Sequence, residues 1–450
     1  MEDFAAGIRS QEQELQQRAA FALDRARSLG ASDCEISIAA SKGLEVSSRN
    51  CELETISYEH DRGMSVTVYS GRRRAHASTT DFSDEAITRT IEAALALTRH
   101  TGDDPCHGVL EERYLCRRFE DFDILHSVIS DPEAAAERCR TLEQYALDQH
   151  APGITRSDGA SCSSTVYSHS YCCSNGFSAT SSSTYSSMGL SLIGEHGGKM
   201  QTDSGFSAHC SPGHLYSTER IAREAIDNTV ARLDVAPIPT GAYTVIFSRR
   251  AAMSVFSRLF QAISGSAVYR ESSFLAGCLG QAVFPDFITV HEDPFERQRL
   301  ESSSYDNEGC ARSACNLVED GILREYLLSA YTARKLGLEP NGHSGGLGST
   351  YVRGRRQCSL PELLQDVGRG LVITAVMGPG VDIVSGNYSQ GACGYYFEHG
   401  QRVHAVDEIT IATNLRELFM GIRALADDYD ERYKLKCPSF AVDNITVSSR

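Results

Sequence analysis

The stretch TGAYTVIFSRRAAMSVFSRLFQAI, residues 240–263, joins a strand pattern to a helix pattern near the middle of the 450-residue chain. Residues 244–247 are mostly β-branched or aromatic, which favours a strand. Residues 249–263 predict a helix, and this segment contains no His, Cys, Asp or Glu. A helix of this composition offers no ligand to a metal ion and no carboxylate or imidazole for acid–base catalysis.

The length and charge of the chain narrow the class of protein. At about 150 residues per domain, 450 residues indicate two or three domains. The chain has 59 acidic and 43 basic residues, a formal net charge of -16. Nucleic-acid binding needs a clustered positive surface, so we expect no nucleic-acid partner. There is no apolar run of about 18 residues and the first residues do not read as a signal peptide, so we expect no membrane association.

The fifteen cysteines indicate a reducing compartment. They are odd in number, scattered, and never spaced as C-x-x-C. At about 3% of the residues, they fall below the density that marks a disulfide scaffold. We therefore expect free thiols and a cytoplasmic protein.

Helix and strand patterns alternate in the first half of the chain. Ser10 followed by Gln13 predicts a capped helix start, and further helices are predicted over residues 83–100, 130–150 and 217–233. The short runs LEVSS, CELETISY, GMSVTVYS and RRAHASTT are separated by Gly and Asn and predict an antiparallel meander. The serine-rich residues 157–211 alternate with apolar ones, which favours long strands with a polar face over a linker.

The best candidate for a domain boundary is the sequence around Pro237, Pro239 and Gly241. We predict an α+β fold with an N-terminal α+β domain of antiparallel strands and helices over residues 1–235. The C-terminal domain, residues 236–450, is predicted to be mostly β. Within it a short stretch is crowded with apolar residues and forms either a subunit interface or ordinary core: Phe274, Leu275, Val283, Phe284 and Phe287.

Several longer motifs together resemble the TldD/PmbA family, whose members have long been called modulators of DNA gyrase and are similar to two-subunit metalloproteases. The motifs are TGAYTVIF (240–247), SFLAGCLGQAVFP (273–285), VMGPGVDIVSGNYSQGACGYYFEHG (376–400), DEITIATNLRELFMGIRALADD (407–428) and CPSFAVDNITVSS (437–449). In the TldD-type subunit the helix that matches residues 249–263 bears H-E-x-x-x-H, which supplies metal ligands and a catalytic glutamate. In the PmbA (TldE) type it does not, and this chain resembles the PmbA type.

The resemblance implies a cytosolic, metal-free subunit that pairs with a TldD-type metalloprotease subunit. It implies zinc in that partner, no catalytic, cofactor-binding or metal residue in this chain, and an extended or unfolded peptide as substrate. We also expect a homodimer when the chain is alone. Two rival hypotheses remain open: a non-catalytic, homodimeric peptide-binding protein, and an independent hydrolase that uses Ser389, Cys393 or an unrecognised metal site.

Two groups of residues are candidates for a metal site in this chain. His209, Cys210 and His214 offer three ligands within six positions, although their spacing fits no standard zinc pattern. The run His291, Glu292, Asp293 resembles a truncated zinc-protease motif, but the following Pro294 would break the helix that such a motif needs.

Other motifs are explained better by structure than by catalysis. Ser389 lies in NYSQG, close to the G-x-S-x-G nucleophile elbow, and Cys393 follows it, yet the surrounding residues predict a β-hairpin. The glycine-rich residues 341–348 (NGHSGGLG) lack the G-K-[ST] of a phosphate loop. The run Arg72, Arg73, Arg74 predicts a charged, solvated strand edge.

Overall fold

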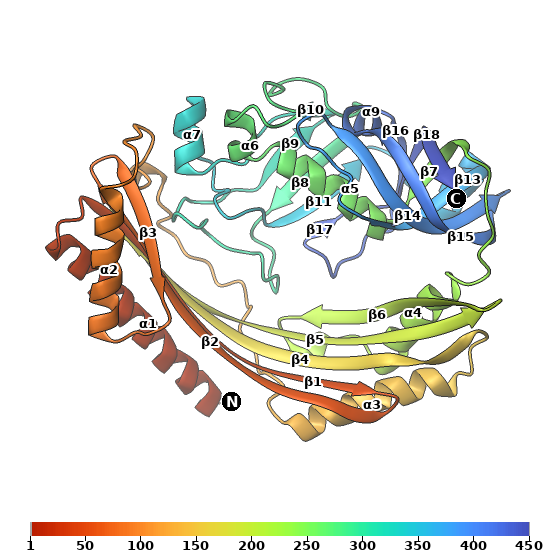
Figure 1. Cartoon of the computed structure of the whole chain (residues 1–450), viewed down its shortest axis with the longest axis horizontal. Coiled ribbons are helices and arrows are strands. Elements are labelled where there is room, and N and C mark those ends of the chain that lie inside the picture. Colours follow the sequence, from red (N-terminus) through yellow and green to blue (C-terminus); the bar gives the residue numbers. More distant parts are fainter. Residues whose placement is uncertain (1, 450) are drawn as a thin grey trace.

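The computed structural model, which describes residues 2–449, consists of a long curved sheet that faces a separate β-rich half (Figure 1). The curved sheet has six antiparallel strands in the order β3-β2-β1-β4-β5-β6. Their bounds are β1 (Asp33–Arg49), β2 (Glu52–Ser70), β3 (Arg73–Thr79), β4 (Ile154–Cys173), β5 (Ser178–His196) and β6 (Lys199–His209). The serine-rich segment thus forms long strands, as predicted.

Helices cover the convex face of this sheet in two groups. The first group, α1 (Glu2–Ser28) and α2 (Asp84–Thr98), packs on one apolar cluster. The second, α3 (Pro132–Asp148) and α4 (Thr218–Val230), packs on another. Both apolar clusters lie on the helix side, and the concave face turns toward the C-terminal half (Figure 1). That face is mostly polar, except at one end of β4, where Tyr171 and Cys173 pack with Phe177 in a smaller apolar cluster.

Most predicted helix starts are confirmed, and one is wrong. The helices predicted from residues 83, 130 and 217 have N-caps at Ser83, Asp131 and Ser217, whose side chains accept backbone N–H groups. Ser10, in contrast, lies inside α1, which begins at Glu2. The apolar stripe continues upstream of Ser10, and Ile8 is buried, so packing extends the helix beyond the predicted cap.

Two glycines predicted to mark turns lie inside strands instead. Gly43 is within β1 and Gly63 is within β2, so LEVSS is only the end of a longer strand, and CELETISY and GMSVTVYS form one strand. A Cβ on Gly43 would lie 2.7 Å from the Thr165 hydroxyl oxygen of the neighbouring strand. Gly43 therefore allows two strands to approach closely. The sequence alone does not distinguish such a glycine from one that forms a turn.

The C-terminal half contains two sheets. The five-stranded sheet has the order β10-β9-β8-β11-β17, and the seven-stranded sheet has the order β12-β16-β18-β15-β14-β13-β7. Since β7 pairs with both β13 and β18, five strands of the larger sheet close into a ring. The strands are β7 (Gly241–Phe247), β8 (Ile288–Asp293), β9 (Cys315–Glu319), β10 (Ile322–Leu323), β11 (Ser349–Gly354), β12 (Gln357–Cys358), β13 (Arg369–Met377), β14 (Asn387–Glu398), β15 (Gln401–Asn414), β16 (Ile422–Ala426), β17 (Leu435–Lys436) and β18 (Phe440–Ser449).

Short helices fill the spaces around these sheets: α5 (Arg249–Ala262), α6 (Gly265–Tyr269), α7 (Ala330–Leu336), α8 (Leu360–Val367) and α9 (Leu415–Met420). The α+β class and the sheet-rich C-terminal half are confirmed. The predicted boundary at residue 235 falls between the end of α4 and the start of β7. Within the part of the chain described, no helix combines the length and apolar character needed to span a bilayer.

The apolar stretch after α5 is core and does not form a free interface patch. Phe274, Leu275, Val283 and Phe284 are buried in the main C-terminal cluster, and Phe287 packs against it while partly buried. The alternative that these residues make an exposed patch is therefore wrong, because β7, α5 and α9 already cover them.

Candidate functional site

The helix α5 is built into the core on one face. It begins after Ser248, whose side chain accepts the N–H of Ala251, and it ends with Ile263 as its C-cap. Its buried positions are all apolar: Ala251, Ala252, Val255, Phe256, Leu259 and Ala262. Phe256 contacts the rings of Phe284, Phe419 and Phe440 at centroid distances of 5.7, 6.0 and 5.6 Å.

A metal ion does not fit this helix. Its inward side chains are hydrocarbon, and the sequence of α5 holds no His, Cys, Asp or Glu. The space that ligands and an ion would need is filled by aromatic rings in contact with Phe256. The predicted helix without ligands is therefore confirmed as a helix, and packing explains its composition.

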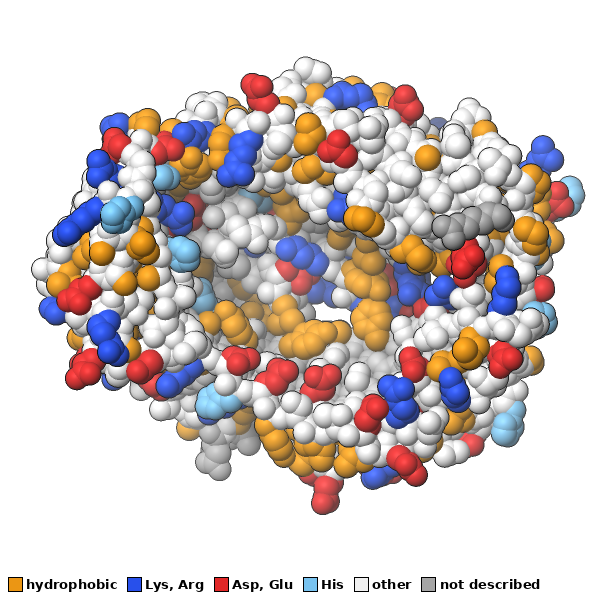
Figure 2. Space-filling model, viewed as in Figure 1, with side chains coloured by type: hydrophobic (Ala, Val, Ile, Leu, Met, Phe, Trp, Pro, Cys, Tyr) orange, Lys and Arg blue, Asp and Glu red, His pale blue; other side chains and the backbone are white. Residues whose placement is uncertain are grey.

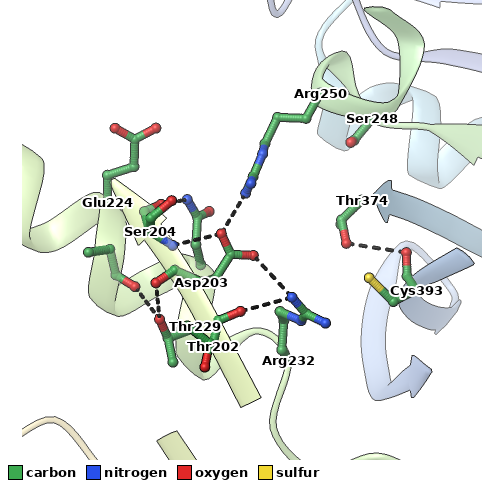
Figure 3. A network of polar contacts seen from close by, with 12 residues as sticks. Thr202, Asp203, Ser204, Glu224, Thr229, Arg232, Ser248, Arg250, Thr374 and Cys393 are labelled. Atoms are coloured by element: carbon green, nitrogen blue, oxygen red, sulfur yellow. Dashed lines mark hydrogen bonds and ion pairs between the residues drawn. The ribbon is translucent and has the colours of Figure 1, made fainter. Parts of the chain in front are cut away.

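A pocket of about 1030 Å³ lies beside the first turn of α5, between the two halves of the chain. Figure 3 shows its polar network, in which Arg250 from α5 and Arg232 both approach Asp203 of β6. The Arg250 to Asp203 distance is 3.0 Å and the Arg232 to Asp203 distance is 3.9 Å. Both arginines are paired with the carboxylate of Asp203, and the Arg250 pair links the C-terminal half to the curved sheet. Neither arginine of Figure 3 is therefore an unpaired cation.

Arg432 makes the tightest link across the same pocket. Its guanidinium lies 2.6 Å from both Glu224 of α4 and Asp430 of the C-terminal half. It also donates to the carbonyl oxygen of Phe206 in β6. The two carboxylates raise the pKa of Arg432 against the opposing effect of burial, so its charge is fixed at every accessible pH.

A second hollow, of about 640 Å³, opens between the concave face of the curved sheet and the C-terminal half. Figure 2 shows this hollow crossing the face of the molecule. Hydroxyl, imidazole and phenol groups of the sheet line one side, including His169, whose Nε2 lies 2.9 Å from the Ser37 hydroxyl. Burial lowers the pKa of His169 and raises that of Glu35. Many of the side chains that line the hollow can donate or accept hydrogen bonds.

Three ligand-type residues meet beneath Arg312 and Ser344, which line this hollow, without lining it themselves. Glu292, Cys315 and His343 place one potential ligand atom each within 4.8 Å of one another. His343 Nε2 lies 2.5 Å from Glu292 Oε2, and Cys315 Sγ lies 3.9 Å from the same oxygen. Burial raises the pKa of Glu292, but His343, Gly348 and Arg312 together hold it below its ordinary value. Burial and the neighbouring Glu292 raise the pKa of the Cys315 thiol to about 12.

Sequence spacing missed this cluster because its members come from three separate segments. Glu292 is on β8, Cys315 begins β9, and His343 lies in the glycine-rich loop 341–348. One signal was available: the alternation of ITVHED puts Glu292 on the same strand face as Ile288 and Val290, and a buried carboxylate needs partners. The helix-breaking argument at Pro294 holds, since these residues form a strand.

The loop 341–348 and the histidine group take other roles than those first considered. The loop packs on β8, and its Gly348 donates a backbone N–H to the carboxylate of Glu292. The loop therefore binds a side chain of the protein itself, and no phosphate site is indicated. His209 and His214 do meet, with ring centroids 4.7 Å apart, and Cys210 Sγ lies 3.6 Å from His209 Nδ1. That nitrogen already accepts the N–H of Ser211, which makes it a poor metal ligand.

The two candidate nucleophiles lie on strands. Ser389 lies near the start of β14 and is paired with Ala412 of β15, so the strand–turn–helix of a nucleophile elbow is not formed. Cys393 is on the same strand and is buried, and burial raises the pKa of its thiol. The predicted hairpin is confirmed. Arg73 and Arg74 are exposed at the start of the edge strand β3, which confirms the predicted solvated edge.

Comparison with known proteins identifies the family to which this chain belongs. Three models of PmbA/TldA metallopeptidase domains match in chain order: domain 1 over residues 34–98, the central domain over 129–233 and the C-terminal domain over 240–449. The first two lie on the one six-stranded sheet. The chain is 34% identical over 444 residues to "Metalloprotease PmbA" of Escherichia coli O157:H7, covering 98% of each protein. It is also 34% identical to "Metalloprotease PmbA homolog" of Haemophilus influenzae, covering 99% of each.

Solved structures share the fold. A protein from Bacteroides thetaiotaomicron described as a modulator of DNA gyrase aligns with a TM-score of 0.90 and 20% identity over 97% of this chain and 99% of that one. TldE from Thermococcus kodakarensis aligns with a TM-score of 0.81 and 19% identity over 95% and 99%. The chain belongs to the PmbA/TldA metallopeptidase family, so the resemblance drawn from its motifs is confirmed.

Proposed function

We propose that this chain is the subunit of a TldD/TldE-type peptidase that lacks the catalytic metal, and that it works with a TldD-type subunit bearing H-E-x-x-x-H and zinc. The observation that carries the proposal is α5, whose inward face is hydrocarbon packed on Phe284, Phe419 and Phe440. No catalytic residue is assigned to this chain. The names of its relatives support a role in proteolysis.

The contribution of the chain is to form part of the wall of a chamber for an extended peptide. The concave sheet face supplies hydroxyl and imidazole groups around the 640 Å³ hollow. The free edge of β6 does not suit strand addition, because side chains already occupy three of its carbonyl oxygens. Arg232 donates to Thr202, Asn228 to Ser204 and Arg432 to Phe206. We therefore place the peptide against the concave face and not along β6.

The proposed location is the cytoplasm. All fifteen cysteines are free thiols, and eleven of them are buried. Free buried thiols in this number are typical of proteins in a reducing compartment. The formal charge of -16 disfavours binding to nucleic acid, so the proposal includes no nucleic-acid partner.

The proposal is tested by reconstitution. Each purified chain is incubated alone, and then mixed with a TldD-type relative from the same genome, with an unfolded protein substrate. We expect cleavage that is much faster in the mixture than in either chain alone and is abolished by a chelator. Proteolysis by this chain alone would support the independent hydrolase, and no gain on mixing would support the non-catalytic binding protein.

Two variants separate these outcomes further. Ser389→Ala and Cys393→Ala should leave the activity of the mixture within a few fold, because both residues lie on strand β14 away from a catalytic arrangement. Loss of a true nucleophile costs several orders of magnitude in rate. A loss of that size with an unchanged circular dichroism spectrum would place the nucleophile in this chain.

A further inference from the structure

We propose that Glu292, Cys315 and His343 form a binding site for one divalent transition-metal ion of the zinc class. The site is separate from α5, and the inference does not depend on the peptidase assignment. It replaces the expectation, implied by the family resemblance, that this chain has no metal-binding residue. Within the described residues, this is the group of three ligand-type side chains whose ligand atoms lie close enough to share one ion.

The backbone prepares the ligand positions. Glu292 and Cys315 are direct partners across the antiparallel strands β8 and β9, so their side chains lie on the same face of the sheet. His343 comes from the loop between α7 and β11, where left-handed glycines at positions 342, 345 and 346 set the chain direction. The backbone N–H of Ser344 donates to the buried Asp306 at 2.9 Å, which anchors the loop beside His343.

The distances suit a tetrahedral ion after a small adjustment. Zinc bonds of about 2.0 Å to nitrogen or oxygen and 2.3 Å to sulfur give ligand–ligand separations of roughly 3.3–3.8 Å. The Cys315 to Glu292 distance of 3.9 Å is already close to this range. The His343 to Glu292 distance of 2.5 Å would open by about 1 Å on binding. Three protein ligands leave the fourth position for water or another donor.

The supporting contacts leave one carboxylate oxygen available. Glu292 Oε1 accepts hydrogen bonds from Gly348 N–H and from Arg312, which is 3.2 Å away. Oε2 faces His343 and Cys315. His343 Nδ1 has no hydrogen-bond partner among the described residues, so no contact at that nitrogen fixes the ring tautomer and Nε2 is free to give up its proton. A bound ion would take Nε2 as a ligand, the ring proton would move to Nδ1, and the thiol proton of Cys315 would go to solvent.

The surrounding charge also favours a divalent cation. Glu292 and three further carboxylates lie at the site or next to its cations, against two cations; the groups are Glu292, Glu301, Asp306 and Glu325 against Arg312 and Lys434. Their formal charge is -2 when His343 is neutral. A mixed sulfur, nitrogen and oxygen ligand set selects zinc or a similar transition metal over magnesium or calcium, which prefer oxygen alone.

The test is a Co²⁺ titration of the full, metal-stripped chain, followed by competition with Zn²⁺. We expect one Co²⁺ per chain, d–d bands of a tetrahedral site, a near-ultraviolet thiolate-to-cobalt band, and displacement by Zn²⁺. Cys315→Ser should remove the thiolate band, and His343→Gln and Glu292→Gln should each weaken Zn²⁺ binding by more than about tenfold. Cys51→Ser is the matched control, because Cys51 is a half-buried thiol far from the site.

The remaining outcomes overturn the proposal. Binding of less than one Co²⁺ per chain at micromolar excess would do so directly. A thiolate band that survives Cys315→Ser but disappears in Cys210→Ser or weakens in His214→Ala would assign the ion to the other histidine group. If Cys315→Ser fails to fold, the two glutamine variants decide the question, since both retain the thiol and most of the side-chain volume.

Discussion

At the scale of single residues, titratable groups that are wholly or partly buried set how stability depends on pH, and Glu308 is a half-buried example. Glu308 accepts the N–H of Ala330 at the start of α7, with an oxygen–nitrogen distance of 2.7 Å. Burial raises its pKa from the ordinary 4.5 to about 7, Asp306 and Glu35 add to the rise, and Ala330 and Arg334 oppose it. The folded chain therefore retains a proton between pH 4.5 and 7 that the unfolded chain has lost.

The sign of the effect follows from that proton. Stability from protonated Glu308 is fully present below pH 4.5 and is lost as the pH rises through about 7. Glu308→Gln keeps an oxygen for the Ala330 N–H without the charge, so it should raise the free energy of unfolding at pH 8 by roughly 1–3 kcal/mol and change little at pH 4.5. Urea unfolding at both pH values measures this, with the exposed Glu112→Gln as control. An equal effect at the two pH values would contradict it.

Residue-level prediction from the sequence succeeded where the cause is local and failed where it is not. The N-caps at Ser83, Asp131 and Ser217 depend on hydrogen bonds two or three residues away, and all three are found. The contact between Glu292 and His343 joins residues 51 positions apart. No local pattern encodes such a pairing, because the fold of the intervening chain decides it.

At the scale of elements, α5 shows how a helix at a functional position can act as core. Phe256→Ala would remove a ring that is fully buried among three others, and we expect a loss of about 3–5 kcal/mol in the free energy of unfolding. Phe260→Ala on the same helix is the matched control, since Phe260 is only partly buried and should cost clearly less. Equal losses for the two variants would show that the ring cluster does not anchor the helix.

Element bounds were harder to predict than element types. The sequence indicated short strands between residues 44 and 79, but it divided them at glycines that the structure keeps inside β1 and β2. The real turns are the left-handed pair Asn50 and Cys51 and the turn at Gly71. A glycine that admits a neighbouring strand and a glycine that reverses the chain differ only in tertiary context.

At the scale of the whole molecule, one surface is incomplete in the single chain. We call it the outer segment of β2, residues 52–62. Strand β3 pairs with β2 only from Met64 to Ser70, so this segment pairs with β1 on one side alone. Nearly all of it is exposed on both faces, and Leu53, Ile56 and Tyr58 are exposed by 47%, 43% and 68%. Long exposed strand edges pair readily with another chain.

The final prediction is that the TldD-type subunit covers this segment. The outer segment carries Glu52, Glu54, Glu59 and Asp61 against Arg62, so the partner surface should be basic and the association should weaken with salt. We expect a complex that buries on the order of 2,000 Å² or more.

The test is co-elution with the partner in size-exclusion chromatography with light scattering. The double variant Ile56→Lys, Tyr58→Lys should no longer co-elute. Met200→Lys is the control and should still co-elute, because Met200 is 64% exposed and lies on the opposite edge strand, β6. Co-elution that is equal for both variants would place the interface elsewhere. A monomeric wild-type chain that fails to co-elute would exclude a shared chamber, because a chamber wall must stay attached to the subunit that cuts.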